Sequence, residues 1–361
     1  MGGNGKEVNE GTSLIFAKNS VKWANNEPTG LGSCPIYAEA LMSKLVLVAV
    51  GGNALIRDGQ KGTAQEQFEN AVETAAAVVR LIRAGHRVVI THGNGPQVGA
   101  QLIRSESAAA FAYRLPLDCC VASTQGEIGY VLQYAMWQMM QAEGLDTPVV
   151  SLITQVLVDS RDPAFQHPTK PIGPSYTKDV AEHYRDLLGW VLVEDRSHGY
   201  RRAVPSPEPV AIIELEAIKA CVDRGLVVIA GGGGGVPVFN DHDISKGVEA
   251  VIDKDHTSAI LARQLSADVF AIATDVDRVS LDFGKPTQRP LDHLTIAQCR
   301  QYLDEGQFPP GSMGPKITAA IKYLELGGKT VLITDHAHLL QGIEGKAGTR
   351  ILCDEEDVIP S

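Results

Sequence analysis

The sequence lacks several features that would assign it to a common class of protein. No apolar run among its 361 residues reaches the ~18 residues that a membrane-spanning helix needs, so we expect no membrane span. Its six cysteines include no C-x-x-C pair, and the adjacent Cys119 and Cys120 have poor spacing for a metal. This pattern is typical of reduced thiols in a cytoplasmic protein. The formal net charge of -11 argues against general electrostatic binding of nucleic acid.

Two familiar nucleotide-binding motifs are also absent. No G-x-x-x-x-G-K-[ST] sequence occurs, which excludes a Walker-type P-loop. The run of five glycines from Gly231 to Gly235 does not fit G-x-G-x-x-G, because Val236 takes the last glycine position. No H-E-x-x-H motif or Cys/His cluster indicates a zinc site. If the chain binds phosphates, it uses a different arrangement of glycines and cations.

Residues 1–43 differ in composition from the rest of the chain. They are rich in Gly, Asn, Ser and Glu and show no clear hydrophobic period, so we interpret them as a disordered leader or as an extension upstream of a start at Met42. An organelle-targeting segment is the alternative. The few basic residues, Lys6, Lys18 and Lys22, and the absence of arginine argue against it.

Strand and helix signals alternate from residue 45 onward. Leu45–Val50 is a continuous apolar run, LVLVAV, typical of a buried parallel strand. Thr63 and Glu66 then have the T-x-x-E spacing of a helix capping box, and Gly85 ends the apolar helical pattern. Further strands are predicted at 88–90, 149–153, 226–230, 269–273 and 330–333, and further helices at 212–222, 257–265 and from Pro315. This alternation predicts an α/β fold: an open, doubly wound, mostly parallel sheet sandwiched by helices.

A proline-rich segment at residues 159–209 interrupts the alternation. It contains one clear strand signal, at 191–193, and is too long for a plain loop in a compact domain. We interpret it as a small inserted subdomain that protrudes over the edge of the sheet. Residues 44–224 then form an N-terminal lobe that includes this insertion, and residues 225–361 form a C-terminal lobe.

Three glycine loops follow predicted strands, at Gly51–Gly52, Gly93–Gly95 and Gly231–Gly235. In open α/β sheets, ligands bind beyond the carboxyl ends of the strands. Glycine lets the backbone approach an anion closely and direct several N–H groups at it. The alternative is that these glycines only permit tight turns between strands and helices. Three such loops at equivalent strand ends favour a phosphate site.

Three lysines are candidates to neutralise phosphate charge. Lys254 lies in VIDKD, Lys316 in GSMGPK and Lys170 in PTKPIGP. A loop lysine is usually a solvated surface charge, but Lys254 and Lys316 lie at predicted helix starts, where a cation is unfavourable unless an anion is present. Asp255 could hold the lysine ammonium groups, and simple helix capping is its alternative role. Phosphoryl transfer between two oxyanions requires no base, so we interpret His92 as structural.

These motifs together resemble one family. The chain resembles carbamate kinase, of the amino-acid kinase superfamily, from about residue 44 to residue 352. The stretches that carry the resemblance are VAVGGNAL, THGNGPQVG, PTKPIGP, VPSPEP, GGGGGVPV, KGVEAVIDKD and PGSMGPK. The TKPIGP subdomain distinguishes carbamate kinases from acetylglutamate, aspartate, glutamate 5- and uridylate kinases. A departure is Ser280, which stands where relatives often carry a tyrosine and bears on the adenine side of the site.

The resemblance implies a homodimeric enzyme that transfers a phosphoryl group reversibly between ATP and carbamate. The N-terminal lobe would bind carbamate or carbamoyl phosphate, and the C-terminal lobe ADP or ATP. Mg²⁺ would be held mainly by the nucleotide phosphates, without a protein metal site. In arginine fermentation the family's reaction runs toward ATP. The alternatives are a related enzyme that acts on another small acid and a non-catalytic regulatory homologue.

The resemblance also implies a role for each matching residue. Lys254 and Lys316 would flank the transferred phosphoryl group, Asp255 would orient them, and Lys170 would reach over from the subdomain. The residues expected around carbamate and the transferred phosphoryl group are Gly51, Gly52, Asn53, Gly93, Asn94 and Gly95. The residues expected around the nucleotide are Gly231, Gly232, Gly233, Gly234, Thr274, Asp275, Val276 and Met313.

Overall fold

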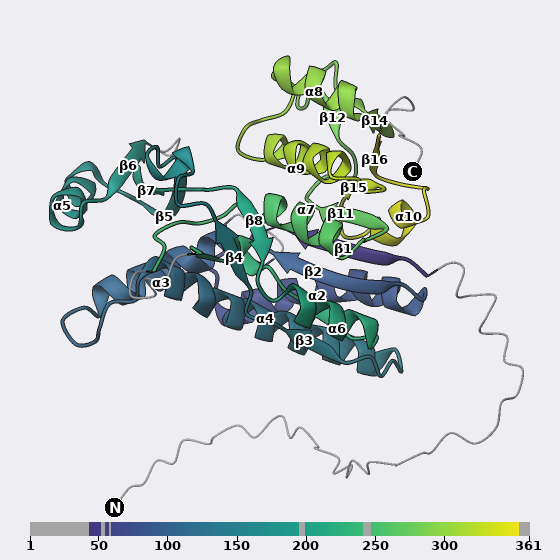
Figure 1. Ribbon diagram of the computed structural model, residues 1–361, viewed down its shortest axis with the longest axis horizontal. Helices are drawn as coiled ribbons and strands as arrows, with labels where there is room; N and C mark the ends of the chain where they lie inside the picture. Colours follow the sequence, from purple (N-terminus) through teal and green to yellow (C-terminus); the bar gives the residue numbers. More distant parts are fainter. Residues whose placement is uncertain (1–42, 52–54, 58, 195–198, 241–246, 354–361) are drawn as a thin grey trace, which may run out of the picture. The chain divides into compact units, whose positions relative to one another are not determined.

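An eight-stranded sheet forms the centre of the fold (Figure 1). The computed structural model describes residues 43–51, 55–57, 59–194, 199–240 and 247–353. In spatial order the strands are β14 (His293–Thr295), β16 (Thr349–Leu352), β15 (Val331–Thr334), β11 (Val269–Ala273), β1 (Leu45–Val50), β2 (Arg87–His92), β9 (Val227–Ile229) and β3 (Val149–Ser151). Neighbouring strands are parallel except β15 and β16. The predicted doubly wound, mostly parallel sheet is confirmed.

Helices cover both faces of this sheet because its central strands are apolar on both sides. In β1, Leu45, Leu47 and Ala49 belong to one core cluster, and the alternate residues belong to the other. The first cluster packs against α6 (Leu215–Asp223), α7 (Lys254–Gln264), α8 (Ile296–Asp304) and α9 (Met313–Glu325). The second packs against α2 (Ala64–Arg83), α4 (Leu117–Ala142) and α10 (Leu339–Ile343).

Helix boundaries follow local sequence signals in one case and depart from them in another. At the start of α2, Thr63 Oγ1 accepts the N–H of Glu66 and the Glu66 carboxylate accepts the N–H of Thr63, which confirms the predicted capping box. The helix predicted at 212–222 begins only at Leu215. Ile212 is instead the last residue of β8 (Pro209–Ile212). An apolar residue fits the pattern of a strand as well as that of a helix, so the sequence did not distinguish the two.

The inserted segment contains more structure than its sequence predicts. The expectation of a single strand at 191–193 was wrong: β5 (Lys170–Tyr176), β7 (Tyr200–Val204) and β6 (Val191–Glu194) form an antiparallel sheet, with α5 (Lys178–Leu188) beside it. Prolines in β5 and arginines in β7 hide the strand pattern. Figure 1 draws these elements as a separate group near α3 (Gly95–Ser107). Gly99 of α3 approaches Gly173 of β5 so closely that a Cβ on it would lie 2.7 Å from the Gly173 Cα.

Shorter elements complete the described structure. These are η3 (Pro163–Phe165), η4 (Gly232–Gly234), β4 (Gln155–Val158), β10 (Val236–Val238), β12 (Ser280–Leu281) and β13 (Arg289–Pro290). β9 lies between β2 and β3, so the sheet is continuous across the predicted lobe boundary at residues 224 and 225, and the division into lobes stays a prediction. Within the described residues, no helix is both long and apolar enough to cross a membrane.

Candidate active site

The loops after adjacent strands of the sheet meet at one cavity. Gly51 follows β1, Gly93 follows β2, Thr274 follows β11, and His336 lies two residues beyond β15. All four line a cavity of ≈ 360 Å³. Since the carboxyl ends of parallel strands share one edge, the doubly wound topology itself creates this site. The prediction that glycine loops follow the strands is confirmed for Gly51 and Gly93.

Three helices begin at the same cavity. Residues from the first turn or cap of α3, α7 and α9 line it, including Gly95, Lys254 and Ser312. The first N–H groups of a helix have no partner within the helix and carry partial positive charge. Three helix N-termini around one space therefore form a site for anions, and phosphate is the anion that such termini commonly bind.

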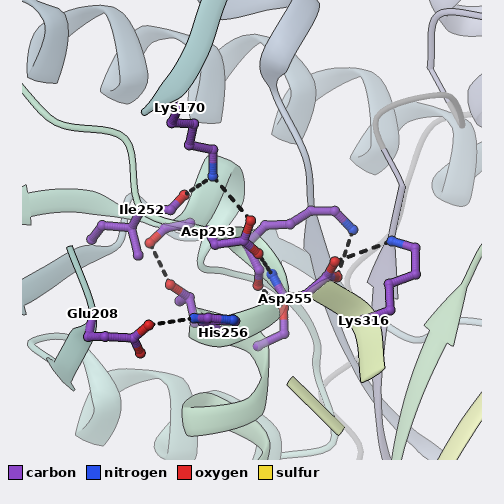
Figure 2. Close-up of polar contacts among 11 residues, drawn as sticks. Lys170, Glu208, Ile252, Asp253, Asp255, His256 and Lys316 are labelled. Atoms are coloured by element: carbon purple, nitrogen blue, oxygen red, sulfur yellow. Dashed lines mark hydrogen bonds and ion pairs between the residues drawn. The ribbon is translucent and has the colours of Figure 1, made fainter. Parts of the chain in front are cut away.

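The carboxylate of Asp255, at the start of α7, contacts two lysines, one on α7 and one on α9 (Figure 2). Asp255 Oδ1 lies 3.0 Å from Lys254 Nζ, and Asp255 Oδ2 lies 3.2 Å from Lys316 Nζ. The side chains of these lysines are only 16% and 12% exposed, so neither is a solvated surface charge. The helix cap is Asp253, whose carboxylate accepts the Asp255 N–H at 2.9 Å. Asp255 is therefore not the cap, and its carboxylate orients the lysines.

The charges in this group favour an additional anion. Burial opposes ionisation of Asp255, but the positive charges of Lys254 and Lys316 outweigh it and hold the pKa of Asp255 well below its usual value. Burial, and then repulsion by Lys254, lower the pKa of Lys316. One carboxylate thus balances two cations, and a phosphate placed between the lysines would supply the missing negative charge.

Lys170, the first residue of β5, lies at the same cavity. Its Nζ donates to the Ile252 carbonyl oxygen at 3.2 Å and lies 3.2 Å from Asp253 Oδ2 (Figure 2). Burial opposes ionisation of Asp253, but Lys170 shifts the balance and the pKa of Asp253 is lowered. Lys170 is therefore held next to the start of α7, and it lines the same cavity as Lys254 and Lys316.

A second cavity of ≈ 240 Å³ adjoins the first. Thr274, Asp275, Ser312 and Lys316 line both. The remaining wall of the second cavity is largely apolar or aromatic and includes Val276, Phe283, Phe308 and Met313, together with Ser280. Four predicted nucleotide-site residues, Thr274, Asp275, Val276 and Met313, therefore come together. An apolar pocket beside one that lysines and helix N-termini line suits a nucleobase joined to phosphates.

Of the four glycines predicted at the nucleotide, one lines a cavity described above. Gly233 lines the first cavity, whereas Gly231, Gly232 and Gly234 line neither cavity. A Cβ on Gly232 would lie 2.4 Å from His92 Nε2, and one on Gly234 would lie 2.3 Å from the Ile252 carbonyl oxygen. These glycines permit close packing of the loop after β9 behind the site. The turn-forming alternative accounts for them, and direct contact of all four with the nucleotide stays a prediction.

The residues predicted around carbamate lie at the first cavity wherever the structure describes them. Gly93, Asn94 and Gly95 line the first cavity with Gly51, whereas Gly52 and Asn53 lie outside the described residues. His92 is buried, and this burial lowers its pKa to about 4, so its ring is neutral at neutral pH. That state agrees with the structural role predicted for it.

Sequence reasoning missed two ionisable residues of the site. Asp253 lies in the same VIDKD segment as Lys254 and caps α7. His336 lines the first cavity, its Nδ1 is buried without a hydrogen-bond partner among the described residues, and burial lowers its pKa. The N-cap preference for aspartate could have identified Asp253. No motif marked His336, whose position depends on the neighbouring strands β11 and β15.

Comparison with known proteins agrees with this geometry. The model described as "Amino acid kinase family" matches residues 44–335. The carbamate kinase of Pyrococcus furiosus is 45% identical over 86% of this chain and 100% of its own length, and carbamate kinase 3 of Staphylococcus aureus is 45% identical over 86% and 99%. The structure of a carbamate kinase from Giardia lamblia bound to AMP-PNP has a TM-score of 0.81 and 38% identity, covering 86% of this chain and 99% of that one. The chain therefore belongs to the amino acid kinase family and, within it, to the carbamate kinases.

Proposed function

We propose that this enzyme transfers a phosphoryl group reversibly between carbamoyl phosphate and ADP, forming carbamate and ATP. The observation that carries the proposal is the position of Lys316, which lines both cavities and shares Asp255 with Lys254. A cation shared by two adjoining cavities suits a group that passes from one substrate to the other. The names of the relatives support carbamate as the acid.

In this proposal the first cavity binds the carbamoyl end of the substrate. It is bordered by Gly51, Gly93, Asn94 and Gly95, and by Lys170 of β5. Gly52 and Asn53 complete the same loop in our proposal. The nucleotide base would enter the second cavity, which places its phosphates beside Thr274, Asp275 and Lys316. The bond from phosphorus to the carbamoyl oxygen breaks as the bond to the terminal ADP oxygen forms.

The protein's contribution to this step is alignment and charge stabilisation. Phosphoryl transfer spreads negative charge over the equatorial oxygens and needs little covalent chemistry from the enzyme. Lys254 and Lys316 are already fixed by Asp255, so their charges need not reorganise during the reaction. The three helix N-termini add partial positive charge around the same space.

We further propose that Mg²⁺ accompanies the nucleotide. Among the described residues no group of three or more His, Cys, Asp or Glu side chains could hold a metal, so the phosphate oxygens would have to supply most of its ligands. Asp275 lines both cavities and is the carboxylate best placed to contact such an ion's shell. The ion would supply charge neutralisation between the β- and γ-phosphates.

We also propose a homodimer in the cytoplasm. Tyr130, Tyr134 and Trp137 of α4 are large side chains exposed by 60%, 40% and 56%, and Tyr134 stacks on Trp137. An exposed aromatic surface of this kind favours association. Light scattering of the wild type and of Trp137→Glu tests the dimer. Cys119, Cys120 and Cys221 are thiols, which supports a reducing compartment.

A coupled assay for ATP formation from ADP, Mg²⁺ and carbamoyl phosphate tests the central proposal. We expect activity from the purified enzyme, with both the full chain and a version that begins at Met42. A panel of other acyl phosphates at equal ADP concentration separates carbamate from other small acids. Folded protein without activity toward carbamoyl phosphate would disprove the proposal and favour the regulatory alternative.

A further inference from the structure

Glu208 lies where the inserted segment returns to the main fold, one residue before β8. Its backbone N–H donates to Asp162 Oδ2 at 2.9 Å. The other oxygen of Asp162 accepts the N–H of Ala164 at 2.8 Å and caps η3 at the start of the insertion. The two ends of the insertion are therefore joined at Glu208.

The Glu208 carboxylate also contacts both helices that carry the site lysines. Its Oε1 lies 2.9 Å from Nδ1 of His256 on α7 (Figure 2), and its Oε2 accepts a hydrogen bond from Nζ of Lys322 on α9. His256 follows Asp255 directly, and Lys322 lies on the same helix as Lys316. One carboxylate thus connects the insertion with α7 and α9.

The contacts with His256 and Lys322 favour the ionised form of Glu208. Hydrogen bonding to His256, and then to Lys322, lowers the pKa of Glu208 to about 2 against the opposing effect of burial, so Glu208 is ionised at any ordinary pH. The charged groups near His256 are Glu208 and Asp253. The Glu208 side chain is 54% exposed, and ion pairs this exposed contribute little to stability.

We propose that Glu208 is a positioning residue for phosphoryl transfer. By holding His256 and Lys322, it fixes α7 and α9 relative to each other and to the insertion that carries Lys170. This inference rests on the proposed function, because it assumes that Lys170, Lys254 and Lys316 act on one transferred group. Misplacement of such groups by ~1 Å can lower the rate as much as ~10²-fold.

The test compares Glu208→Gln with a control on α9, the helix that Glu208 contacts through Lys322. Glutamine keeps the size of Glu208 but loses the charge, and its amide can accept from only one of the two partners at a time. The control, Glu325→Gln, breaks the exposed pair between Glu325 of α9 and Arg300 of α8. We expect Glu208→Gln to lower kcat about tenfold with the KM for ADP changed less than about threefold. The control should leave both unchanged.

A second comparison separates positioning from loss of structure. His256→Gln retains a side-chain N–H that can donate to Glu208, whereas His256→Ala does not. We expect His256→Gln to keep most of the activity that His256→Ala loses. Lys322→Met serves in place of Glu208→Gln if that variant does not fold. Equal kcat for Glu208→Gln, or for its substitute, and the Glu325→Gln control would overturn the proposal.

A readout independent of activity keeps this inference distinct from the proposed function. Hydrogen exchange of the backbone amides in α7 and α9 should be faster in Glu208→Gln and unchanged in Glu325→Gln. If the wild type lacks activity toward carbamoyl phosphate, the proposed function fails, and hydrogen exchange still decides the positioning role. Identical exchange in the two variants would overturn that role.

Discussion

The ammonium group of Lys316 lies 3.2 Å from Asp255 Oδ2, although the two residues are 61 positions apart in the chain. Their side chains are 12% and 5% exposed. Burying an ion pair removes both charges from water, and this desolvation can cost more free energy than the attraction between the charges returns. Here one carboxylate also holds Lys254, and both ammonium-bearing residues line a cavity. The arrangement is therefore better explained by anion binding than by stability.

Replacing either lysine should impair the chemical step. Lys254→Met and Lys316→Met keep an apolar stem but remove the cation, so we expect kcat to fall about 10²-fold or more, the loss typical of one preorganised transition-state donor. Lys219→Met on α6, whose partner is the exposed Glu216, is the control. Steady-state kinetics of ATP formation measures the effect. If kcat falls no more than in the control, both lysines are ordinary surface charges and the proposed role is wrong.

The contribution of Asp255 to stability should depend on pH in the acid range. Its folded pKa lies below the ordinary value of 3.8. A carboxyl group of this kind stabilises the fold fully above its unfolded pKa, and that stabilisation is lost as pH falls through the folded pKa. Asp255→Asn should therefore be less stable than the wild type at neutral pH, and the difference in free energy of unfolding should shrink below about pH 3.8.

Urea unfolding at a series of pH values measures this difference. Asp304→Asn, at an exposed position on α8, is the control and should show no such trend. A difference for Asp255→Asn that stays constant or grows on acidification would contradict the argument.

The glycine run should tolerate substitution less than an ordinary turn glycine. Gly233 and Gly225 have φ values of +65° and +79°, so alanine at either position strains the backbone by about 1 kcal/mol. A Cβ on Gly233 would also lie 2.2 Å from Asn94 Nδ2. A Cβ on Gly225 would have no heavy atom within 4 Å apart from those of the glycine itself and its two chain neighbours. Displacing the Asn94 amide would disturb its hydrogen bond to Thr124 Oγ1.

We therefore expect Gly233→Ala to lose both stability and kcat, and Gly225→Ala to lose stability alone. Thermal unfolding and steady-state kinetics on the two variants distinguish these outcomes. Equal kinetics would show that the loop can shift without disturbing Asn94.

Enlarging Ser280 should weaken nucleotide binding selectively. Ser280 is 9% exposed and lines the second cavity, so a tryptophan there, larger than the tyrosine that relatives often carry, would occupy part of its volume. We expect Ser280→Trp to raise the KM for ADP at least about tenfold, the equivalent of about 1.4 kcal/mol, with little change in the KM for carbamoyl phosphate. Ser280→Ala is the control. Similar changes in both KM values would argue against a nucleotide in this cavity.

The sequence predicts those parts of the fold in which local pattern and environment agree. The apolar run at Leu45–Val50 predicts a strand correctly because a strand buried on both faces is apolar throughout. The capping box at Thr63 is equally local. In contrast, β5 contains prolines and β7 begins with a tyrosine and two arginines. Their strand state depends on pairing with each other and with β6, which no local pattern reveals.

The same distinction applies to the site. Lys170 and Lys316 were predictable as candidates because each lies next to a proline in a short motif, and Lys254 because it lies in VIDKD before a predicted helix. Their convergence on one cavity depends on the tertiary packing of three segments. Glu208 lies in VPSPEP, but nothing local shows that its carboxylate contacts α7 and α9, and no motif marks His336. Their surroundings come from helices and strands distant in sequence.

The walls shared by the two cavities have a consequence for inhibitor design. Thr274, Asp275, Ser312 and Lys316 border both spaces, so the two cavities lie next to each other along these residues. A single compound that joins a nucleoside to an acid-like group through a phosphate chain could occupy both spaces at once. Because the second group then binds intramolecularly, such a bisubstrate compound should bind far more tightly than either half alone.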